Sequence, residues 1–149
     1  MADIVSKEQR SRMMSGIKSK DTKIEISIRK ALFSNGFRYR LHDQKLPGKP
    51  DLVFPKYKAV IFINGCFWHG HNCQLYTEPK SNTEFWRAKI ERNRLNDIKN
   101  MISLQKKGWR VMNVWECSLR NRTISEIESV IESLTDWLRS SESFCEVRR

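Results

Sequence analysis

Apolar residues recur at the helical period in three segments of the chain. The first segment is residues 21–36, where Thr22 can cap the start of a helix. A longer helix is expected over residues 83–107, and a third over 123–138. The positions expected to form the core faces of these helices are Ile24, Ile28, Ala31 and Leu32, then Leu95, Ile98 and Ile102, and finally Ile124, Ile127, Val130, Ile131 and Leu134.

Shorter apolar runs between these helices predict strands. Residues 37–42 and 109–116 alternate between apolar and polar, as half-buried strands do. Residues 51–54 form a brief apolar run, and 58–63 are almost continuously apolar and β-branched, which favours a central strand. Because helices and strands follow one another along the chain, we expect an α/β fold with a mixed central sheet flanked by helices on both faces.

The length of the chain, 149 residues, predicts one folded domain with a hydrophobic core. We expect residues 1–20 to be a basic N-terminal arm or helix and residues 21–140 to be the domain. Residues 141–149 read as a disordered tail.

The chain is strongly basic, with 28 Lys and Arg against 17 Asp and Glu and a net charge of +11. This excess favours nucleic acid as the partner, with an anionic membrane surface second and a charge that serves only solubility third. No signal peptide is evident, and the longest apolar run, 59–63, is too short to span a bilayer. We therefore expect a cytoplasmic protein that does not insert in membranes and whose four cysteines are thiols or metal ligands.

The segment "INGCFWHGHNC", residues 63–73, combines ligand types that zinc prefers. Cys66, His71 and Cys73 lie within eight residues, and a tetrahedral site needs one more donor. The alternative is that the cysteines are small buried hydrophobes. His69, in the same segment, is by itself most simply a solvated side chain.

Cys117 is the best candidate for the fourth ligand. It directly follows the strand expected over 109–116, which would lie parallel to the strand over 58–63. The two strands would then end side by side and bring Cys117 to the zinc segment. Cys145, near the C-terminus, is the poorer candidate.

Two carboxylates are candidates for metal-dependent phosphodiester hydrolysis. Asp51 opens a buried strand, where nucleases place a carboxylate that binds Mg²⁺, although it also fits a turn after Pro50. Glu25 follows Thr22 at the spacing of a capping box, and Arg29 is placed for an ion pair with it. The residues alone favour a structural role for Glu25 and leave Asp51 open.

Aromatic residues in a basic context suggest contact with DNA. Phe67 and Trp68 lie in the zinc segment, and large apolar side chains there can wedge between base pairs. Trp86, Lys89 and Asn93 share one edge of the long helix, which could face a groove. The alternative is that these aromatics pack locally on the zinc segment.

Four separated motifs occur in order along the chain: "LPGKPDLVF", "VIFINGCFWHGHNC", "TEFWRAKIERN" and "GWRVMNVWEC". Together they resemble the very short patch repair (Vsr) family of DNA mismatch endonucleases, in one register from about Arg10 to about Leu138. The resemblance implies a restriction-endonuclease-like fold with one structural Zn²⁺ and two catalytic Mg²⁺ ions. It also implies that the protein nicks duplex DNA 5′ of the thymine in T·G mismatches, which arise when 5-methylcytosine deaminates.

The resemblance assigns chemical roles to single residues. Asp51 resembles the Mg²⁺-binding carboxylate, His69 the general base that activates water, and Glu25 an acidic partner near the water around the metal. The residues that match the zinc ligands are Cys66, His71, Cys73 and Cys117.

One position departs from the family pattern. Ile63-Asn64 stands where the family has Thr-His. The family contact at the threonine is its backbone carbonyl, which Ile63 can also supply to Mg²⁺. Asn64 can form hydrogen bonds but cannot take up a proton near neutral pH, so we expect it to position water or phosphate while His69 carries the proton.

The resemblance also implies how the protein meets its partner, double-stranded DNA with a T·G mismatch. We expect a monomer, with mismatch-repair proteins as further candidate partners. The rival interpretations are a non-catalytic zinc protein that binds distorted duplex DNA and a nuclease without mismatch preference. Residues that match DNA-contacting positions are Phe67, Trp68 and Trp86 as intercalators, Lys89 and Asn93 at the mismatched pair, and Met14 and Ile17 at the minor groove.

Overall fold

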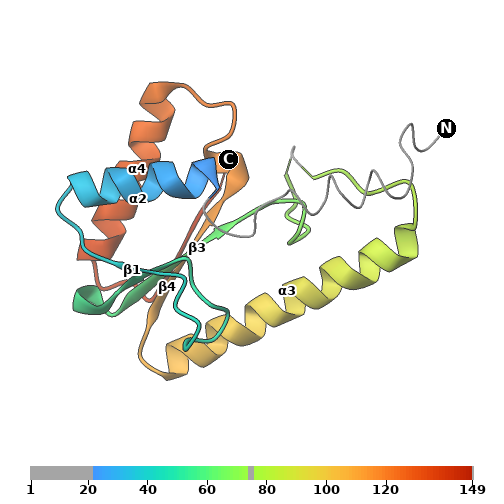
Figure 1. The fold of residues 1–149 in the computed structure, drawn as a ribbon, viewed down its shortest axis with the longest axis horizontal. Coiled ribbons are helices and arrows are strands. Elements are labelled where there is room, and N and C mark those ends of the chain that lie inside the picture. Colours follow the sequence, from blue (N-terminus) through green and yellow to red (C-terminus); the bar gives the residue numbers. More distant parts are fainter. Residues whose placement is uncertain (1–21, 74–75, 149) are drawn as a thin grey trace.

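The computed structural model describes residues 22–73 and 76–148, which form a mixed sheet with helices on both faces (Figure 1). None of the helices in these ranges is long and apolar enough to cross a bilayer. The described helices are α2 (Lys23–Ser34), α3 (Thr83–Lys106) and α4 (Ile124–Arg139), with short 3-10 turns at Pro55–Tyr57 and Glu116–Ser118. The strands are β1 (Arg40–Leu41), β2 (Leu52–Phe54), β3 (Ala59–Asn64), β4 (Arg110–Trp115) and β5 (Phe144–Val147).

The sheet of the described residues has five strands in the order β1-β2-β3-β4-β5. β1, β2 and β3 are antiparallel neighbours, whereas β3, β4 and β5 run parallel to one another. The register pairs Ala59 with Arg110 at one end and Asn64 with Trp115 at the other. The parallel pairing that the sequence predicts for these two strands is thus confirmed, and the loops that follow them start side by side.

The central strands face two cores, because side chains alternate between the faces of a strand. On one face Ile61 and Met112 pack with residues of α2 and α4. On the other face Val60 and Val111 pack with Leu104 of α3. The expectation of an α/β fold with helices on both sides of a mixed sheet is confirmed.

Local sequence signals set the helix ends. The Thr22 hydroxyl accepts a hydrogen bond from the Glu25 amide at 3.2 Å, and Thr123 and Glu126 form a reciprocal capping box at the start of α4. Each such cap stabilises a helix by about 1 kcal/mol. After α3, Gly108 has a φ of +86°, a left-handed conformation that ends the helix at little steric cost.

The expected core face of the long helix is wrong. Leu95, Ile98 and Ile102 are 57%, 52% and 45% exposed, whereas Ile90 and Leu104 are buried on the opposite side of α3. The inner face of α3 is polar in its middle, so the apolar residues with helical spacing lie on the exposed face. The spacing therefore predicts the wrong side of the helix as the core face. The half-buried polar residues in the middle of the inner face are Asn93, Asp97 and Asn100.

The C-terminal segment also differs from the expectation. Within 141–149, which the sequence suggests is a disordered tail, residues Phe144–Val147 pair in parallel with β4 as strand β5. Cys145 and Val147 pack on the larger core, which explains why four residues suffice to cover this sheet edge. The folded domain therefore extends past residue 140. The N-terminal arm, with Met14 and Ile17, lies outside the described residues.

Candidate active site

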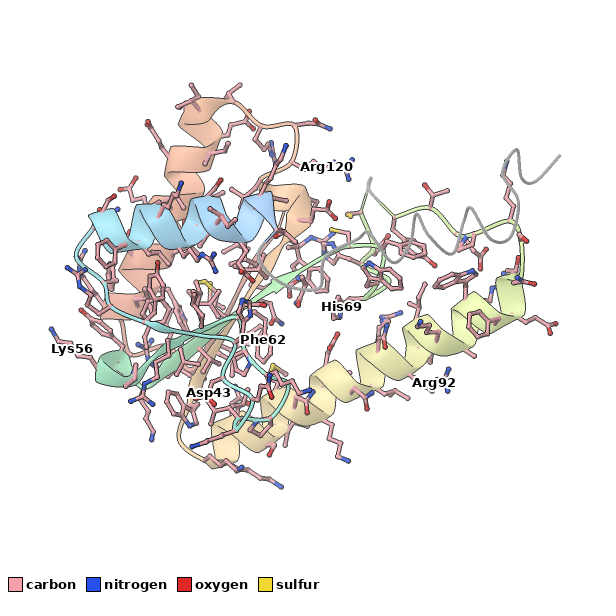
Figure 2. All side chains as sticks on the ribbon, in the orientation of Figure 1. Asp43, Lys56, Phe62, His69, Arg92 and Arg120 are labelled. Carbon is pink, nitrogen blue, oxygen red and sulfur yellow. The ribbon has the colours of Figure 1, made fainter. Side chains whose placement is uncertain are left out.

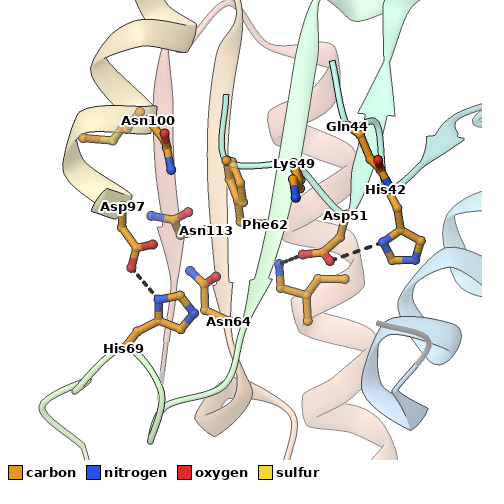
Figure 3. A pocket seen from close by; sticks show the side chains of 13 residues that line it. His42, Gln44, Lys49, Asp51, Phe62, Asn64, His69, Asp97, Asn100 and Asn113 are labelled. Atoms are coloured by element: carbon orange, nitrogen blue, oxygen red, sulfur yellow. Dashed lines mark hydrogen bonds and ion pairs between the residues drawn. The ribbon is translucent and has the colours of Figure 1, made fainter. Parts of the chain in front are cut away.

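Polar side chains from separate parts of the chain line a cavity of about 420 Å³ beside the sheet (Figure 3). The segment between β1 and β2 contributes His42 and Asp51. Asn64 comes from the end of β3 and His69 from the loop after it, while Asp97 comes from the inner face of α3. The structure thus brings together Asp51, Asn64 and His69, which sequence reasoning proposes as catalytic residues.

Asp51 directly precedes β2 and is held by a hydrogen bond from the neighbouring strand β3. Its Oδ2 accepts a hydrogen bond of 2.7 Å from the Ile63 amide. Burial and, to a smaller extent, the nearby Glu25 carboxylate together raise the pKa of the Asp51 carboxyl from 3.8 to about 7, against the lowering effect of the Ile63 amide. A carboxylate in this setting is favoured when a cation is available to balance its charge.

Glu25 lies behind Asp51 and is almost fully buried in the first turn of α2. Its Oε2 is 3.1 Å from Nη1 of Arg29 and 3.2 Å from Nε2 of His42. The Thr22 hydroxyl caps the Glu25 amide and Arg29 pairs with the Glu25 carboxylate, as a structural role for Glu25 requires. The same carboxylate also contacts His42 and adds to the negative charge around Asp51, so a structural and a chemical role are compatible.

His69 lies between the end of β3 and α3 (Figure 2). Its Nδ1 forms a hydrogen bond with the Asp97 carboxylate, and Figure 3 shows the other ring nitrogen on the side of Asn64. A carboxylate on Nδ1 fixes the orientation of an imidazole and keeps that nitrogen protonated. His69 is therefore a held side chain that presents Nε2 to the cavity, and the solvated alternative is wrong.

The predicted thiol cluster joins the same loop to the 3-10 turn that follows β4. Donor atoms of Cys66, His71, Cys73 and Cys117 all lie within 4.8 Å of one another. Nδ1 of His71 is 3.6 Å from Sγ of both Cys66 and Cys117. Sulfur and nitrogen ligands of a tetrahedral Zn²⁺ lie about 3.6 Å apart at ordinary bond lengths, so the cluster has the dimensions of a zinc site.

Burial favours the neutral forms of these groups, so a thiolate in this cluster needs a cation to balance its charge. Burial raises the pKa of the Cys66 thiol, with the neighbouring cysteines adding to the effect, and it lowers the pKa of His71. The His71 ring stacks on Trp115 at 4.0 Å between centroids, and its Nε2 faces the Glu146 carboxylate at 3.7 Å. These contacts orient the imidazole toward the three thiols.

Aromatic side chains of the loop after β3 and of the start of α3 pack together. Phe67, Trp68 and Trp86 contact one another with ring centroids 5.2 to 5.9 Å apart. The Lys89 ammonium lies 5.5 Å from the rings of both tryptophans, and the Asn93 amide donates to the Trp68 carbonyl at 2.8 Å. The local packing that the sequence offers as an alternative is therefore present, on a surface that also carries positive charge beside the candidate catalytic residues.

Comparison with known proteins identifies the family. The family model described as DNA mismatch endonuclease Vsr matches residues 2–75. The DNA mismatch endonuclease Vsr of Escherichia coli K12 is 44% identical over 138 residues, which are 93% of this chain and 88% of that protein. The chain belongs to the Vsr DNA mismatch endonuclease family.

Other relatives of this chain in the Vsr family are type II nicking enzymes. V.NmeAIP of Neisseria meningitidis serogroup A is 52% identical over 83% of this chain and 89% of its own length. V.XorIIP of Xanthomonas oryzae pv. oryzae is 42% identical over 91% of this chain and 98% of its own length. This member of the Vsr family is accordingly a DNA nicking endonuclease.

Two residues of the cavity escape the sequence reasoning. Asp97 is missed because the apolar stripe of α3 predicts that the opposite, polar face of the helix is exposed. The signal available was the helical spacing of Asn93, Asp97 and Asn100. His42 is missed because it ends an alternating segment and has no neighbouring ligand in the sequence. Both become visible only when β1, β2 and α3 are placed around one cavity.

Proposed function

We propose that this Vsr-family enzyme nicks duplex DNA on the 5′ side of the thymine in a T·G mismatch, in a Mg²⁺-dependent hydrolysis that leaves a 5′-phosphate and a 3′-hydroxyl. The observation that carries the proposal is the shared cavity, in which Asp51 and the His69–Asp97 pair face the same space. The flanking bases and the partner methyltransferase lie outside this proposal.

Asp51 and the Ile63 carbonyl are the groups proposed to hold Mg²⁺. The fit rests on the partly buried Asp51 carboxyl, whose raised pKa reflects a negative charge that lacks sufficient compensation in the protein alone. Mg²⁺ takes oxygen ligands and needs few of them from the protein. When bound, Mg²⁺ would polarise the scissile phosphate and offset the charge that develops on it.

The His69–Asp97 pair is proposed to move the proton. Asp97 keeps Nδ1 of His69 protonated, so Nε2 is left to accept a proton from the attacking water. Asn64, at the buried end of β3, is proposed to orient the water or a phosphate oxygen by hydrogen bonding. Glu25 is proposed to hold the water network behind Asp51 while it keeps α2 in place.

The cluster of Phe67, Trp68 and Trp86 is proposed to enter the base stack beside the mismatch. A T·G wobble pair is easier to distort than a Watson–Crick pair, so part of the selectivity would come from deformability. Lys89 and Asn93 lie on the same side and are proposed to contact the mismatched bases. Met14 and Ile17 are proposed to approach from the minor groove.

Strand-labelled duplexes with T·G, T·A and C·G at one position test the function directly. We expect a single Mg²⁺-dependent nick in the thymine strand of the T·G duplex alone. Equal cleavage of the T·A duplex would indicate a nuclease without mismatch preference. Binding of the T·G duplex with no nick under any divalent cation would indicate a non-catalytic binder of distorted DNA.

Removing one thiol of the Cys66–His71–Cys73–Cys117 cluster tests whether the cluster binds a structural Zn²⁺ or consists of free cysteines. We expect Cys117→Ser to lose bound zinc and to lower stability by about 4 kcal/mol or more, since loss of a metal is among the largest single effects. For a chain of this size that corresponds to a drop in Tm of roughly 10 °C. Metal analysis and thermal unfolding measure both quantities.

Cys145→Ser is the matched control, because this thiol packs on the larger core outside the cluster. It should retain full zinc content. Full zinc in the Cys117→Ser variant, or loss of zinc from the Cys145→Ser variant, would contradict the proposed ligand set.

Shortening an aromatic of the proposed wedge should reduce mismatch recognition. We expect Trp68→Ala to weaken binding of T·G duplex by about tenfold, because stacking of an aromatic side chain on a base contributes about 1–3 kcal/mol. Binding titrations with T·G and T·A duplexes give the ratio of affinities. Phe33→Ala, which removes an exposed aromatic on α2, should leave this ratio unchanged. An unaltered ratio in Trp68→Ala would remove this side chain from recognition.

A further inference from the structure

The three histidines of the chain have three different surroundings. His71 belongs to the thiol cluster, and His69 is held by Asp97. His42 instead lies beside the carboxylates of Glu25 and Asp51, as Figure 3 shows for Asp51. The mechanism proposed above gives His42 no task.

The imidazole of His42 faces both carboxylates. Its Nε2 is 3.2 Å from Oε2 of Glu25, and its Nδ1 is 3.7 Å from Oδ1 of Asp51. One donor atom from each of the three residues lies within 4.8 Å of the others. Ligands on opposite sides of a small divalent cation are about 4.2 Å apart, so shifts of a few tenths of an ångström would place all three around one ion.

The three side chains are held by different elements of the fold. Glu25 is fixed in the first turn of α2, where its side chain is only 3% exposed. Asp51 is fixed by the Ile63 amide of β3, and the His42 amide donates to the Asp51 carbonyl at 3.1 Å. The three donors therefore come from α2 and from the two paired ends of the β1–β2 segment, where the Ile63 amide of β3 also holds Asp51.

The chemistry of this set differs from that of carboxylates alone. Carboxylates suit Mg²⁺, which prefers oxygen ligands, whereas an imidazole suits first-row transition metals that accept nitrogen. We propose that Glu25, His42 and Asp51 form a binding site for a divalent transition-metal ion, with Mn²⁺ as its representative. The inference rests on the proposed function in one respect, since Asp51 is the ligand that the two share.

Pulsed EPR of Mn²⁺ bound to the full-length, zinc-loaded protein without DNA tests the site directly. We expect one bound Mn²⁺ to show the coupling of a coordinated ¹⁴N nucleus. The coupling should vanish in His42→Gln, a variant that can still hydrogen-bond Glu25, and persist in His69→Ala. Absence of the coupling from the wild type, or its survival in His42→Gln, would mean that His42 forms only ion pairs.

Affinity gives a second readout that needs no activity. We expect His42→Gln to weaken Mn²⁺ binding by about tenfold or more and Mg²⁺ binding by no more than about twofold, because only the nitrogen ligand is lost. Equal weakening of both ions, with the fold intact by circular dichroism, would overturn the inference. A wild type that binds Mn²⁺ no more tightly than Mg²⁺ would do the same.

Nicking assays with Mg²⁺ distinguish a failure of the proposed metal site from a failure of the proposed function. Nicking of the T·G duplex by a wild type that shows no nitrogen coupling would remove the Mn²⁺ site and leave the proposed function standing. A coordinated nitrogen in a protein that nicks no duplex would support the site and remove the proposed function.

Discussion

Replacing Asp51 with asparagine is expected to lower the rate of nicking of a T·G duplex by about 10³-fold or more. Asparagine has nearly the same shape and can still accept a hydrogen bond from the Ile63 amide, but it lacks the charge that holds a cation. Loss of several kcal/mol of charge stabilisation has this effect, because each 1.36 kcal/mol is tenfold in rate. Single-turnover cleavage with saturating enzyme measures the chemical step.

The same variant should be more stable than the wild type at pH 8 when no magnesium is added. Burial raises the pKa of Asp51 from 3.8 to about 7, so between these values the folded state binds a proton that the unfolded state does not. Wild-type stability therefore falls as the pH rises from about 4 to 7, by at most about 4 kcal/mol from this group. Asparagine does not titrate, so the variant escapes that loss.

Thermal unfolding at pH 4, 6 and 8 checks this expectation and serves as the folding control. An inactive variant that is equally or more stable at pH 8 has lost a ligand and kept its fold. Wild-type nicking activity in Asp51→Asn would show that Asp51 takes no part in the reaction. A variant less stable than the wild type at pH 8 would contradict the expectation that the Asp51 charge destabilises the fold.

Replacing His69 with alanine is expected to lower the nicking rate by roughly 10²- to 10⁴-fold, the usual contribution of a general base. Affinity for the T·G duplex should stay within about threefold, because the aromatic cluster that is proposed to bind DNA remains. Single-turnover rates and binding titrations separate the two quantities. An unchanged rate would take His69 out of proton transfer.

Asp97 acts through His69 in this mechanism, so Asp97→Asn should be milder. Without the carboxylate, the His69 ring loses the contact that orients it toward the cavity. The nicking rate should fall with DNA affinity unchanged, and Asp97→Glu, which keeps a carboxylate, should restore part of the rate. A rate that Asp97→Glu does not restore, with the fold intact, would point to a packing role for Asp97 alone.

The zinc cluster shows how far sequence spacing reaches. Three donors within eight residues imply a site, and the parallel pairing of two apolar strands supplies Cys117 from 44 residues further on. Strand pairing was inferable because both strands are apolar enough to be central. The ends of two parallel neighbours meet by geometry, whatever the loops between them do.

The face of α3 shows where the same reasoning fails. Leu95, Ile98 and Ile102 have helical spacing and yet lie outside, because the inner face of the helix borders a polar cavity. Hydrophobic periodicity reports the core face only where the partner surface is apolar. β5 was missed for a related reason, since a four-residue strand gives too little alternation to recognise.

By itself the sequence determined the α/β class, the grouping of Cys66, His71, Cys73 and Cys117, the family resemblance and the candidate residues Asp51 and His69. Only the tertiary structure showed that Asp97 holds His69 and that His42 stands between Glu25 and Asp51. The physical reason is that spacing along the sequence predicts which side chains lie together within one helix, strand or loop. The meeting of single polar residues from β1, β2, β3 and α3 depends on strand register and helix packing, which leave no local pattern in the chain.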